Sequence, residues 1–273
     1  MQPTEIGATE WLANLSIGYV VLAAFALTAL RLILVPNRGA FARSVAELVE
    51  SLIIAGVLVF LVIRPFFLQA FFIPSESMEP TLMGHNEGIS PTGEKYSDTV
   101  HDHIFVNKMV YRLREPKRGE IIVFKAEKKA DKSSELSGKE PVENVLIKRL
   151  IALPGDTVEV REDETGTLRV FVNRKMLQEH YVKKPMQSNP QSGFGTGSPL
   201  KLGPADLFVM GDNRNNSNDS HHWGVLTRDR VIGRAEILFW PLNRVRIFQW
   251  WLLAFFGIVF IAYNLFQRSL PPR

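Results

Sequence analysis

The stretch that decides the fold lies near the middle of the chain and reads Val145-Leu146-Ile147-Lys148-Arg149-Leu150-Ile151-Ala152-Leu153. It is short, mostly apolar and rich in branched side chains, and the turn signal Pro154-Gly155-Asp156 follows it, which indicates a β-strand. Because side chains alternate between the two faces of a strand, Lys148 and Arg149 must point in opposite directions. One cation can then face a site while the other meets a carboxylate. An edge strand with two solvated bases is the alternative.

Other short apolar runs of the same kind lie on both sides of this strand. They occupy residues 104–106, 121–124, 157–160, 168–172, 207–210 and 237–240. Turn signals such as Gly211-Asp212-Asn213 separate the runs, and no long helical period appears between residues 74 and 243. The expected fold class is therefore mainly β, with an antiparallel β domain over residues 74–245.

The composition excludes several classes of protein. The chain has 273 residues, 32 Lys+Arg against 28 Asp+Glu, and no cysteine. A disulfide scaffold, thiol catalysis and a thiolate metal site are thus impossible. The small basic surplus comes without a stripe of interleaved basic and aromatic residues, so no nucleic-acid partner is expected. The mean hydropathy of +0.01 averages very unlike parts, because the apolar residues crowd into a few segments.

Three of those segments are candidates for transmembrane helices. Residues 11–30 carry no charge over about 20 positions, enough to cross a hydrocarbon core of roughly 30 Å. A cleaved signal peptide is the alternative, but its start would be basic, whereas Glu5 and Glu10 precede this run. The second segment opens with the capping box Ser44-Val45-Ala46-Glu47. We expect spanning helices at about 11–34, 45–64 and 247–266; for the third of these, a buried core helix is the other interpretation.

The basic residues predict an orientation in the cytoplasmic membrane. Arg31, Arg38 and Arg43 lie in the short loop between the first two segments, and such residues are retained in the cytoplasm. The amino terminus and the β domain are then extracytoplasmic. The expected organisation is an amino-terminal anchor over residues 1–73, the β domain, and a carboxy-terminal span with a short tail over residues 246–273.

Two polar segments could carry chemistry together with the central strand. Ser75 and Ser77 stand between Pro74 and Pro80, and we expect the prolines to hold both hydroxyls on a stiff, non-helical stretch. A polar turn leaving a membrane is an equally ordinary interpretation. Residues 210–224 are almost wholly polar between two apolar runs, so they form either an inert loop in water or a buried network.

Taken together and in this order, the three segments resemble the type I signal peptidases, membrane-anchored serine proteases that remove signal peptides from exported proteins. The resemblance covers about residues 71–242. It implies that Ser77 is the nucleophile and Lys148 the general base. By the same resemblance, Ser75 would add its hydroxyl to the oxyanion hole, and Ser217 would hydrogen-bond and orient Lys148.

The resemblance also implies supporting and substrate-binding residues. Arg149 would pair with Asp212, and Asp219 fits the acidic position of the last motif. Substrates would have small side chains one and three residues before the cut, read by shallow pockets formed by Phe71, Ile73, Pro74, Met78, Leu82, Val123, Leu146 and Ile147. Two departures affect the detail: Glu76 where the family often has glycine, and His221-His222 where it often has Arg-Tyr.

Elementary electrostatics sets a condition on the lysine. An ordinary lysine, with a pKa near 10.4, is almost wholly charged at pH 7 and cannot accept a proton from serine. A pKa near 8 requires the site to disfavour the ammonium by about 3.3 kcal/mol, and burial is the available means. Ser77 would then form an acyl-enzyme that water hydrolyses.

Other functions remain as alternatives. A Ser-His-Asp hydrolase could use Asp219 with His221 or His222, although these residues crowd within four positions. A non-catalytic membrane-anchored β domain is a third hypothesis. His101-Asp102-His103 could be invoked for a metal, yet such a pair is more often solvated, so neither a metal nor a cofactor is expected. The expected partners are preprotein signal peptides and the phospholipid bilayer, with the export translocon as a further candidate.

Overall fold

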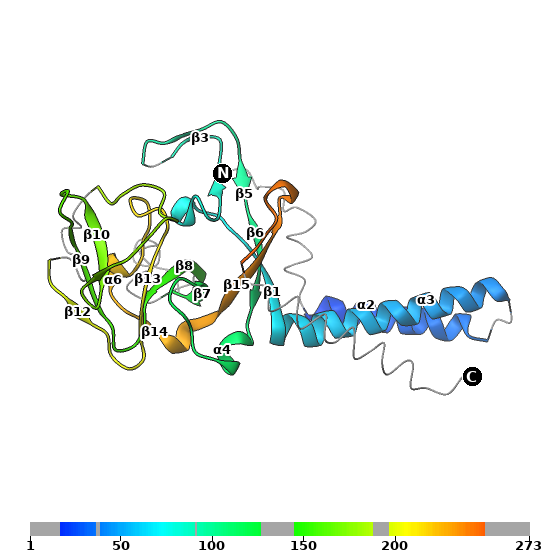
Figure 1. Cartoon of the computed structure of the whole chain (residues 1–273). Helices are drawn as coiled ribbons and strands as arrows, with labels where there is room; N and C mark the ends of the chain where they lie inside the picture. Colours follow the sequence, from blue (N-terminus) through cyan, green and yellow to red (C-terminus); the bar gives the residue numbers. More distant parts are fainter. Residues whose placement is uncertain (1–16, 37–38, 91, 127–144, 188–196, 249–273) are drawn as a thin grey trace, which may run out of the picture. The chain divides into compact units, whose positions relative to one another are not determined.

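The computed structural model of the chain describes residues 17–36, 39–90, 92–126, 145–187 and 197–248 (Figure 1). They belong to two compact units. One unit contains the amino-terminal part through Ala70 together with residues 107–109. The other contains the rest of the chain from Phe71 onward, including nearly all of the β structure.

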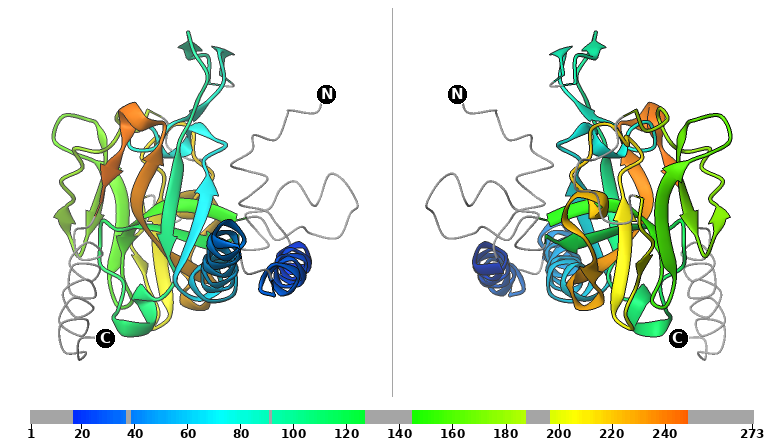
Figure 2. Two further views of the ribbon diagram at one scale, coloured as in Figure 1. Left: turned by 90° about the vertical axis from the view of Figure 1, so that its right-hand side faces the viewer. Right: turned by 90° about the vertical axis from the view of Figure 1, so that its left-hand side faces the viewer.

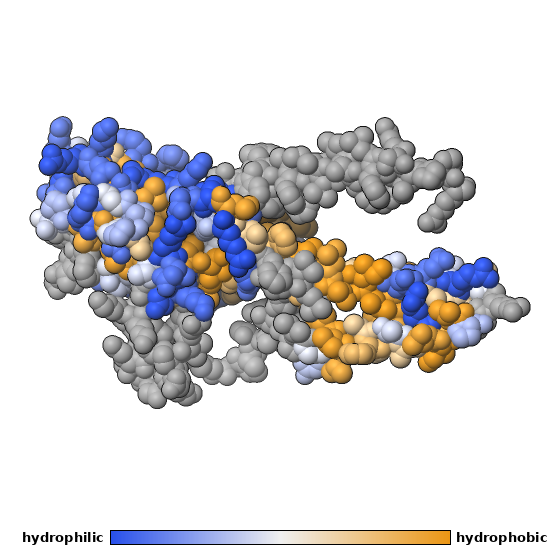
Figure 3. All heavy atoms as spheres, turned by 90° about the horizontal axis from the view of Figure 1, so that it is seen from below, coloured by the Kyte–Doolittle hydropathy of each residue, from blue (hydrophilic) through white to orange (hydrophobic). Residues whose placement is uncertain are grey.

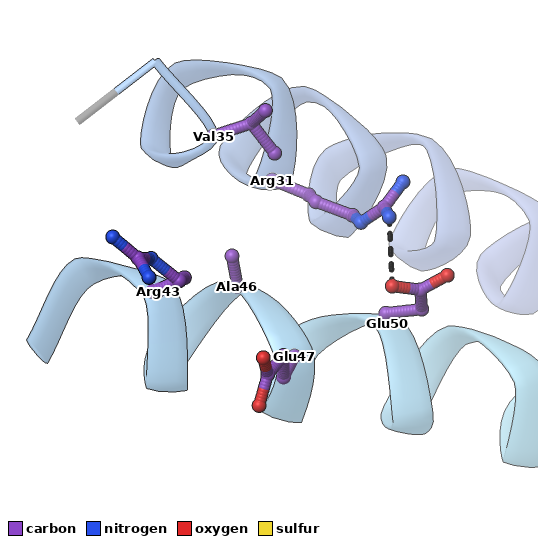
Figure 4. Close-up of a pocket in the computed structure, with 6 residues that line it drawn as sticks. All are labelled: Arg31, Val35, Arg43, Ala46, Glu47 and Glu50. Carbon is purple, nitrogen blue, oxygen red and sulfur yellow. Dashed lines mark hydrogen bonds and ion pairs between the residues drawn. The ribbon is translucent and has the colours of Figure 1, made fainter. Parts of the chain in front are cut away.

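The first unit is built from two helices that pack side by side. They are α2 (Ile17–Leu34) and α3 (Ala40–Val57), and α3 continues as the π-helical turn η1 (Leu58–Phe67). Arg31 on α2 donates to the carboxylate of Glu50 on α3 at 2.7 Å (Figure 4). Many large apolar side chains on both helices, among them Phe25 and Leu52, are exposed (Figure 3). Among the described residues, no helix combines the length and the apolar character that a membrane crossing requires.

The helix boundaries correct part of the sequence-based expectation. The first helix ends at Leu34 as predicted, and its start before Ile17 lies outside the described residues. The second begins at Ala40, with Gly39 as its N-cap, so Ser44 lies inside the helix and forms no capping box. The residues before Ser44 include no helix breaker after Gly39, which lets the helix extend back by a turn. Most of the third segment lies outside the described residues, and its first residue, Ile247, belongs to a strand.

The second unit is organised around one large antiparallel sheet. Its strand order is β1-β6-β15-β7-β8-β13-β14, with β16 paired to β15. The strands are β1 (Leu68–Phe72), β6 (His103–Asn107), β7 (Ile121–Lys125), β8 (Val145–Ala152), β13 (Asp206–Met210), β14 (Leu226–Thr227), β15 (Val231–Trp240) and β16 (Arg246–Ile247). The strand direction rotates strongly across the sheet (Figure 2). The predicted mainly antiparallel β fold is confirmed.

Smaller sheets and single turns complete this unit. A four-stranded sheet has the order β11-β10-β9-β12, and two hairpin-like pairs join β2 to β5 and β3 to β4. Their bounds are β9 (Thr157–Glu162), β10 (Leu168–Val172), β11 (Lys175–Met176), β12 (Leu200–Lys201), β2 (Gly84–His85), β5 (Val100–His101), β3 (Gly88–Ile89) and β4 (Lys95–Tyr96). The helical turns are η2 (Glu76–Met78), α4 (Val110–Leu113), α6 (Ser220–Trp223), η4 (Arg228–Arg230) and η5 (Leu242–Arg244).

The core anchors the elements that carry the polar motifs. Strand β8 pairs with β7 so that Lys148 lies opposite Ile122 and Arg149 opposite Ile121. The turn η2 is held by Met78 and Leu82, which are fully buried in the same apolar cluster as Val123 of β7. Each such side chain contributes roughly 1.5–3 kcal/mol when removed from water. Apolar packing therefore fixes the turn that follows β1 against the centre of the large sheet.

Candidate active site

Ser77 lies in the single helical turn η2. This turn begins directly after Ser75, whose backbone is extended. The backbone N–H of Glu79 donates to the Glu76 carbonyl at 3.0 Å and closes this turn. Ser77 itself is only 8% exposed. The serine is thus held stiffly, as expected, but on a helical turn and not on the non-helical stretch that the prolines predicted.

Lys148 projects from β8 directly onto this serine. Its ammonium nitrogen Nζ lies 2.8 Å from Ser77 Oγ and 2.9 Å from the Ile147 carbonyl oxygen. The side chain is 3% exposed, and burial lowers the pKa of Lys148 to about 8, although the negative charges of Asp219 and Asp212 raise it. The condition derived from the sequence, an amine able to accept a proton near neutral pH, is met by desolvation.

Ser75 contributes a second hydroxyl beside the first. The Ser75 Oγ lies 3.3 Å from Ser77 Oγ. Ser75 is exposed to solvent, whereas Ser77 is buried. The Ser75 backbone is also tightly packed, because a Cβ on Gly84 would come within 2.4 Å of its carbonyl oxygen. The two serines that the sequence singled out therefore lie together at the edge between buried and solvent-accessible space.

Arg149 lies on the neighbouring position of β8 and makes a buried ion pair. Its Nε donates to Asp212 Oδ1 at 2.8 Å and its Nη2 to Asp212 Oδ2 at 2.5 Å. Thr81 donates to the same carboxylate at 2.5 Å, and Arg149 Nη1 donates to the Gly119 carbonyl at 2.8 Å. The planar guanidinium matches the carboxylate in two parallel bonds, and removing either partner would leave a buried charge.

The polar segment 210–224 is a buried network. Asp219 caps the turn α6, accepts from Gly211 N–H at 2.7 Å and pairs with His221 Nδ1. Burial raises the pKa of Asp219, but His221 and these hydrogen bonds outweigh burial and lower it to about 2. Ser217 is buried without a well-formed hydrogen bond and does not bond to Lys148, although its closeness to Asp219 contributes to the lowered pKa of that carboxyl.

Gly211, Asn213 and Asn216, to which the sequence argument gave no role at the site, clamp the serine turn. The Asn213 backbone N–H donates to the Ser77 carbonyl at 3.2 Å, and its Nδ2 donates to the Glu76 carbonyl at 3.3 Å. Asn216 Nδ2 donates to the Glu76 carboxylate at 2.8 Å. An added Cβ on Gly211 would lie 2.3 Å from both Ser77 O and Ser217 Oγ. The glycine in the turn signal at 211–213 was visible in the sequence, but the partner of its close approach was not.

Comparison with known proteins decides the family of this site. The family model described as signal peptidase, peptidase S26, matches residues 45–240. The chain belongs to this family of signal peptidases. Similar relatives are a probable signal peptidase I-2 of a Synechocystis species, 39% identical over 73% of this chain and 75% of the relative, and a signal peptidase I of Leptolyngbya laminosa, 42% identical over 70% and 77%. A signal peptidase I P of Bacillus subtilis subsp. natto is 33% identical over 74% of this chain and 93% of the relative.

The predicted substrate-binding residues of this signal peptidase fall into two groups. Six of them meet in one apolar cluster that also holds the serine turn: Ile73, Met78, Leu82 and Val123 are buried in it, and Phe71 and Ile147 pack against it. Leu146 instead packs against a different cluster, around Phe124 and Leu150, and Pro74 is exposed. Six of the eight residues therefore lie together in one cluster beside the serine turn, and their role in substrate binding stays a prediction.

The histidines of the signal peptidase have partners of their own. His101 is hydrogen-bonded to the Ile73 carbonyl at 2.9 Å and to Asn86 at 3.1 Å, while Asp102 accepts from Arg244 at 2.8 and 3.0 Å. His221 faces Asp219, whereas the Ser77 hydroxyl faces Lys148 and Ser75. Within the described residues, the group whose ligand atoms could meet at a metal is Asp219, His221 and His222. The arrangement around Ser77 therefore favours lysine over histidine as its base.

Proposed function

We propose that this signal peptidase cleaves signal peptides from exported preproteins with Ser77 as nucleophile and Lys148 as general base. The observation that carries the proposal is the 2.8 Å separation of Lys148 Nζ and Ser77 Oγ in a buried setting. A neutral amine at that distance can take the hydroxyl proton as Ser77 Oγ attacks the peptide carbonyl. Lys148 Nζ then gives that proton to the leaving amine of the substrate. The neutral Lys148 next takes a proton from water, which attacks and hydrolyses the acyl-enzyme.

The residues around the pair would stabilise and position the reacting atoms. Ser75 Oγ, 3.3 Å from Ser77 Oγ, would donate to the oxyanion together with the Ser77 backbone N–H. Asp219 holds the backbone of Gly211 close to Ser77, and Ser217 lies on the same side of that backbone. The Arg149–Asp212 pair ties β8 to the loop that follows β13. The roles proposed for Ser75, Arg149 and Asp212 follow those that the family resemblance implied, whereas the predicted hydrogen bond from Ser217 to Lys148 is wrong, because Ser217 Oγ does not bond to Lys148.

The substrate would be a membrane-tethered peptide with small side chains one and three residues before the cut. Phe71 and Ile147, which are partly buried and pack against the apolar cluster around Ile73 and Met78, would offer the substrate an apolar wall beside the serine turn. A preprotein would lie along this wall in extended form and present its carbonyl to Ser77. Small residues at these two positions fit such shallow, apolar recognition.

We further propose that α2, α3 and the third apolar segment anchor the enzyme in the cytoplasmic membrane with the β unit outside. Support comes from the uncharged run of about 20 residues at 11–30 and from the exposed apolar side chains of both helices. The Arg31–Glu50 pair joins the two helices, and paired charges facing a neighbouring helix are the usual form of ionisable groups in apolar surroundings. Signal peptides and phospholipids would be its partners, and contact with the export translocon would involve the membrane segments.

A preprotein digest tests the substrate assignment. The purified enzyme in detergent should release one mature protein, and its mass should place the cut after a small residue just beyond the apolar core of the signal peptide. The control is the same preprotein with a bulky isoleucine at the residue before the cut, which should not be processed at that bond. Cleavage at scattered bonds, or equal processing of the isoleucine variant, would rule out this specificity.

The pH dependence of the reaction tests the base. Because burial lowers the pKa of Lys148 to about 8, raising the pH through 8 deprotonates the amine, and kcat/KM should rise with that midpoint. At pH 7 about one tenth of the enzyme would hold the neutral base. Rates are measured between pH 5.5 and 9.5 with a peptide that has no titratable group near the cut. A midpoint near 6.5 would point to histidine and against Lys148.

A further inference from the structure

One five-residue segment outside the sequence motifs contacts the supports of both Ser77 and Lys148. We call residues 179–183 the brace. Its first contact is with Arg214, whose guanidinium makes two hydrogen bonds to the Glu179 carboxylate, one of them at 2.9 Å. Both side chains are buried, and Arg214 Nε also donates to the Gly211 carbonyl at 3.0 Å. The brace therefore holds the backbone of the glycine that packs against Ser77.

The second contact of the brace is with the strand of the general base. The guanidinium carbon of Arg149 lies 4.0 Å from the centre of the Tyr181 ring, a distance at which a cation is attracted to an aromatic face. The Tyr181 hydroxyl donates to Glu179 at 3.0 Å, which fixes the ring. Arg149 is the neighbour of Lys148 on β8. The contact with Tyr181 therefore stabilises the orientation of the strand that carries Lys148.

The third contact joins the brace to the serine turn. The Lys183 backbone N–H donates to the Asp212 carbonyl at 3.0 Å, and its Nζ donates to Glu79 Oε2 at 2.8 Å. Glu79 is 1% exposed and ends the turn that carries Ser77. The same ammonium also contacts Tyr96 at 2.8 Å and the carboxylate of Glu94. One residue thus links the turn of the nucleophile to the loop that pairs with Arg149.

Electrostatics makes Lys183 the decisive member of the brace. Burial raises the pKa of Glu79, but hydrogen bonds from Lys183, His85 and Tyr96 outweigh burial and hold it below its usual range. Without the Lys183 ammonium, the nearly inaccessible Glu79 carboxylate would keep only the hydrogen bonds from His85 and Tyr96. An under-compensated buried charge moves toward water or takes up a proton, and either response shifts the turn that it ends.

We propose that Lys183 is a positioning residue of this signal peptidase, which through Glu79 and the Asp212 carbonyl keeps Ser77 Oγ within reach of Lys148 Nζ. The inference rests on the proposed Ser77–Lys148 chemistry and adds a residue that none of the three motifs contains. It predicts a defect in the chemical step with little effect on substrate binding, because Lys183 supports the reacting atoms and not the apolar wall.

The test compares Lys183→Met with Lys184→Met and Lys183→Arg. Lys184 is the matched control: it donates to the same Glu94 at 2.6 Å and its side chain is 56% exposed, but its contact is with Glu94 and not with Glu79 or Asp212. We expect Lys183→Met to lower kcat about tenfold with KM changed less than about twofold. Lys183→Arg should restore most of kcat, because its cation can reach Glu79, and Lys184→Met should equal the wild type.

Parallel measurements separate the possible failures. A wild-type kcat in folded Lys183→Met, or an equal loss in Lys184→Met, would overturn the positioning role. Ser77→Ala is assayed beside them: if it still cleaves, the proposed dyad itself fails, whereas an inactive Ser77→Ala with a fully active Lys183→Met rejects the brace alone. If Lys183→Met does not fold, Lys183→Gln takes its place, since its neutral amide also removes the charge that compensates Glu79; an unchanged kcat there would reject the positioning role as well.

Discussion

Replacing Lys148 with methionine is expected to abolish preprotein cleavage and to stabilise the fold. General-base catalysis contributes about 10²- to 10⁴-fold, so kcat should fall by about two to four orders of magnitude when the amine is lost. Ser77→Ala should be equally inactive, and the double variant no worse, because groups that act as a unit are not additive. Residual rates are measured by quantifying the mature product over long incubations.

The gain in stability follows from the lowered pKa of the lysine. A fall from 10.5 to about 8 corresponds to a cost of about 3 kcal/mol that the native state bears when the amine is charged. Losing the hydrogen bonds to Ser77 and the Ile147 carbonyl offsets about 1 kcal/mol each. The net gain of about 1 kcal/mol should raise the melting temperature by roughly 2–4 °C at pH 7.

The pH dependence of that gain fixes its origin. Below pH 8 the lysine is charged in both states and the native state carries the full cost. Between pH 8 and 10.5 the unfolded chain binds the proton and the native state does not, so wild-type stability rises, and the gap to the variant closes and then reverses. Lys175→Met, at an exposed position, should show neither the gain nor the closing gap. A variant less stable than the wild type at pH 7, or a pH-independent gap, would contradict this explanation.

Gly211→Ala is expected to reduce kcat about 100-fold without unfolding the β unit. The added Cβ would lie 2.3 Å from the Ser77 carbonyl oxygen and from Ser217 Oγ, and 2.6 Å from Ser217 Cβ. Ordinary contact requires a separation larger by about 1 Å, and a misplacement of that size costs about 10² in rate. Gly211 has no left-handed φ, so crowding alone excludes the larger residue.

A matched glycine substitution distinguishes crowding at the site from a general effect of alanine. Gly56 in α3 has open space around its Cβ position, and Gly56→Ala should cleave preproteins at the wild-type rate. Both variants are compared by initial rates at saturating substrate and by thermal melting. An active Gly211→Ala would mean that the Asn213 loop and the Ser77 turn can separate without consequence, which would remove the role given to that contact.

Local sequence patterns predicted the fold and its two central chemical groups. The branched apolar runs at 121–124 and 145–153 became β7 and β8, because strand preference depends on neighbouring residues and on turn signals. Alternation along a strand predicted that Lys148 and Arg149 would diverge, and they contact Ser77 and Asp212 respectively. The start of α3 was wrong, because a capping box describes one local possibility while the helix extends for as long as no residue stops it.

By itself, the sequence determined that this chain forms a mainly antiparallel β unit with a Ser, Lys and Asp set in a recognisable order. Only the tertiary structure decided that the ammonium of Lys148 is buried against Ser77, that Gly211 touches the serine turn, and that Lys183 joins Glu79 to the loop of Asp212. Strand formation depends on residues next to one another, which a linear pattern contains. These contacts join residues dozens of positions apart, and they exist because the sheet curls and buries charges that must find partners.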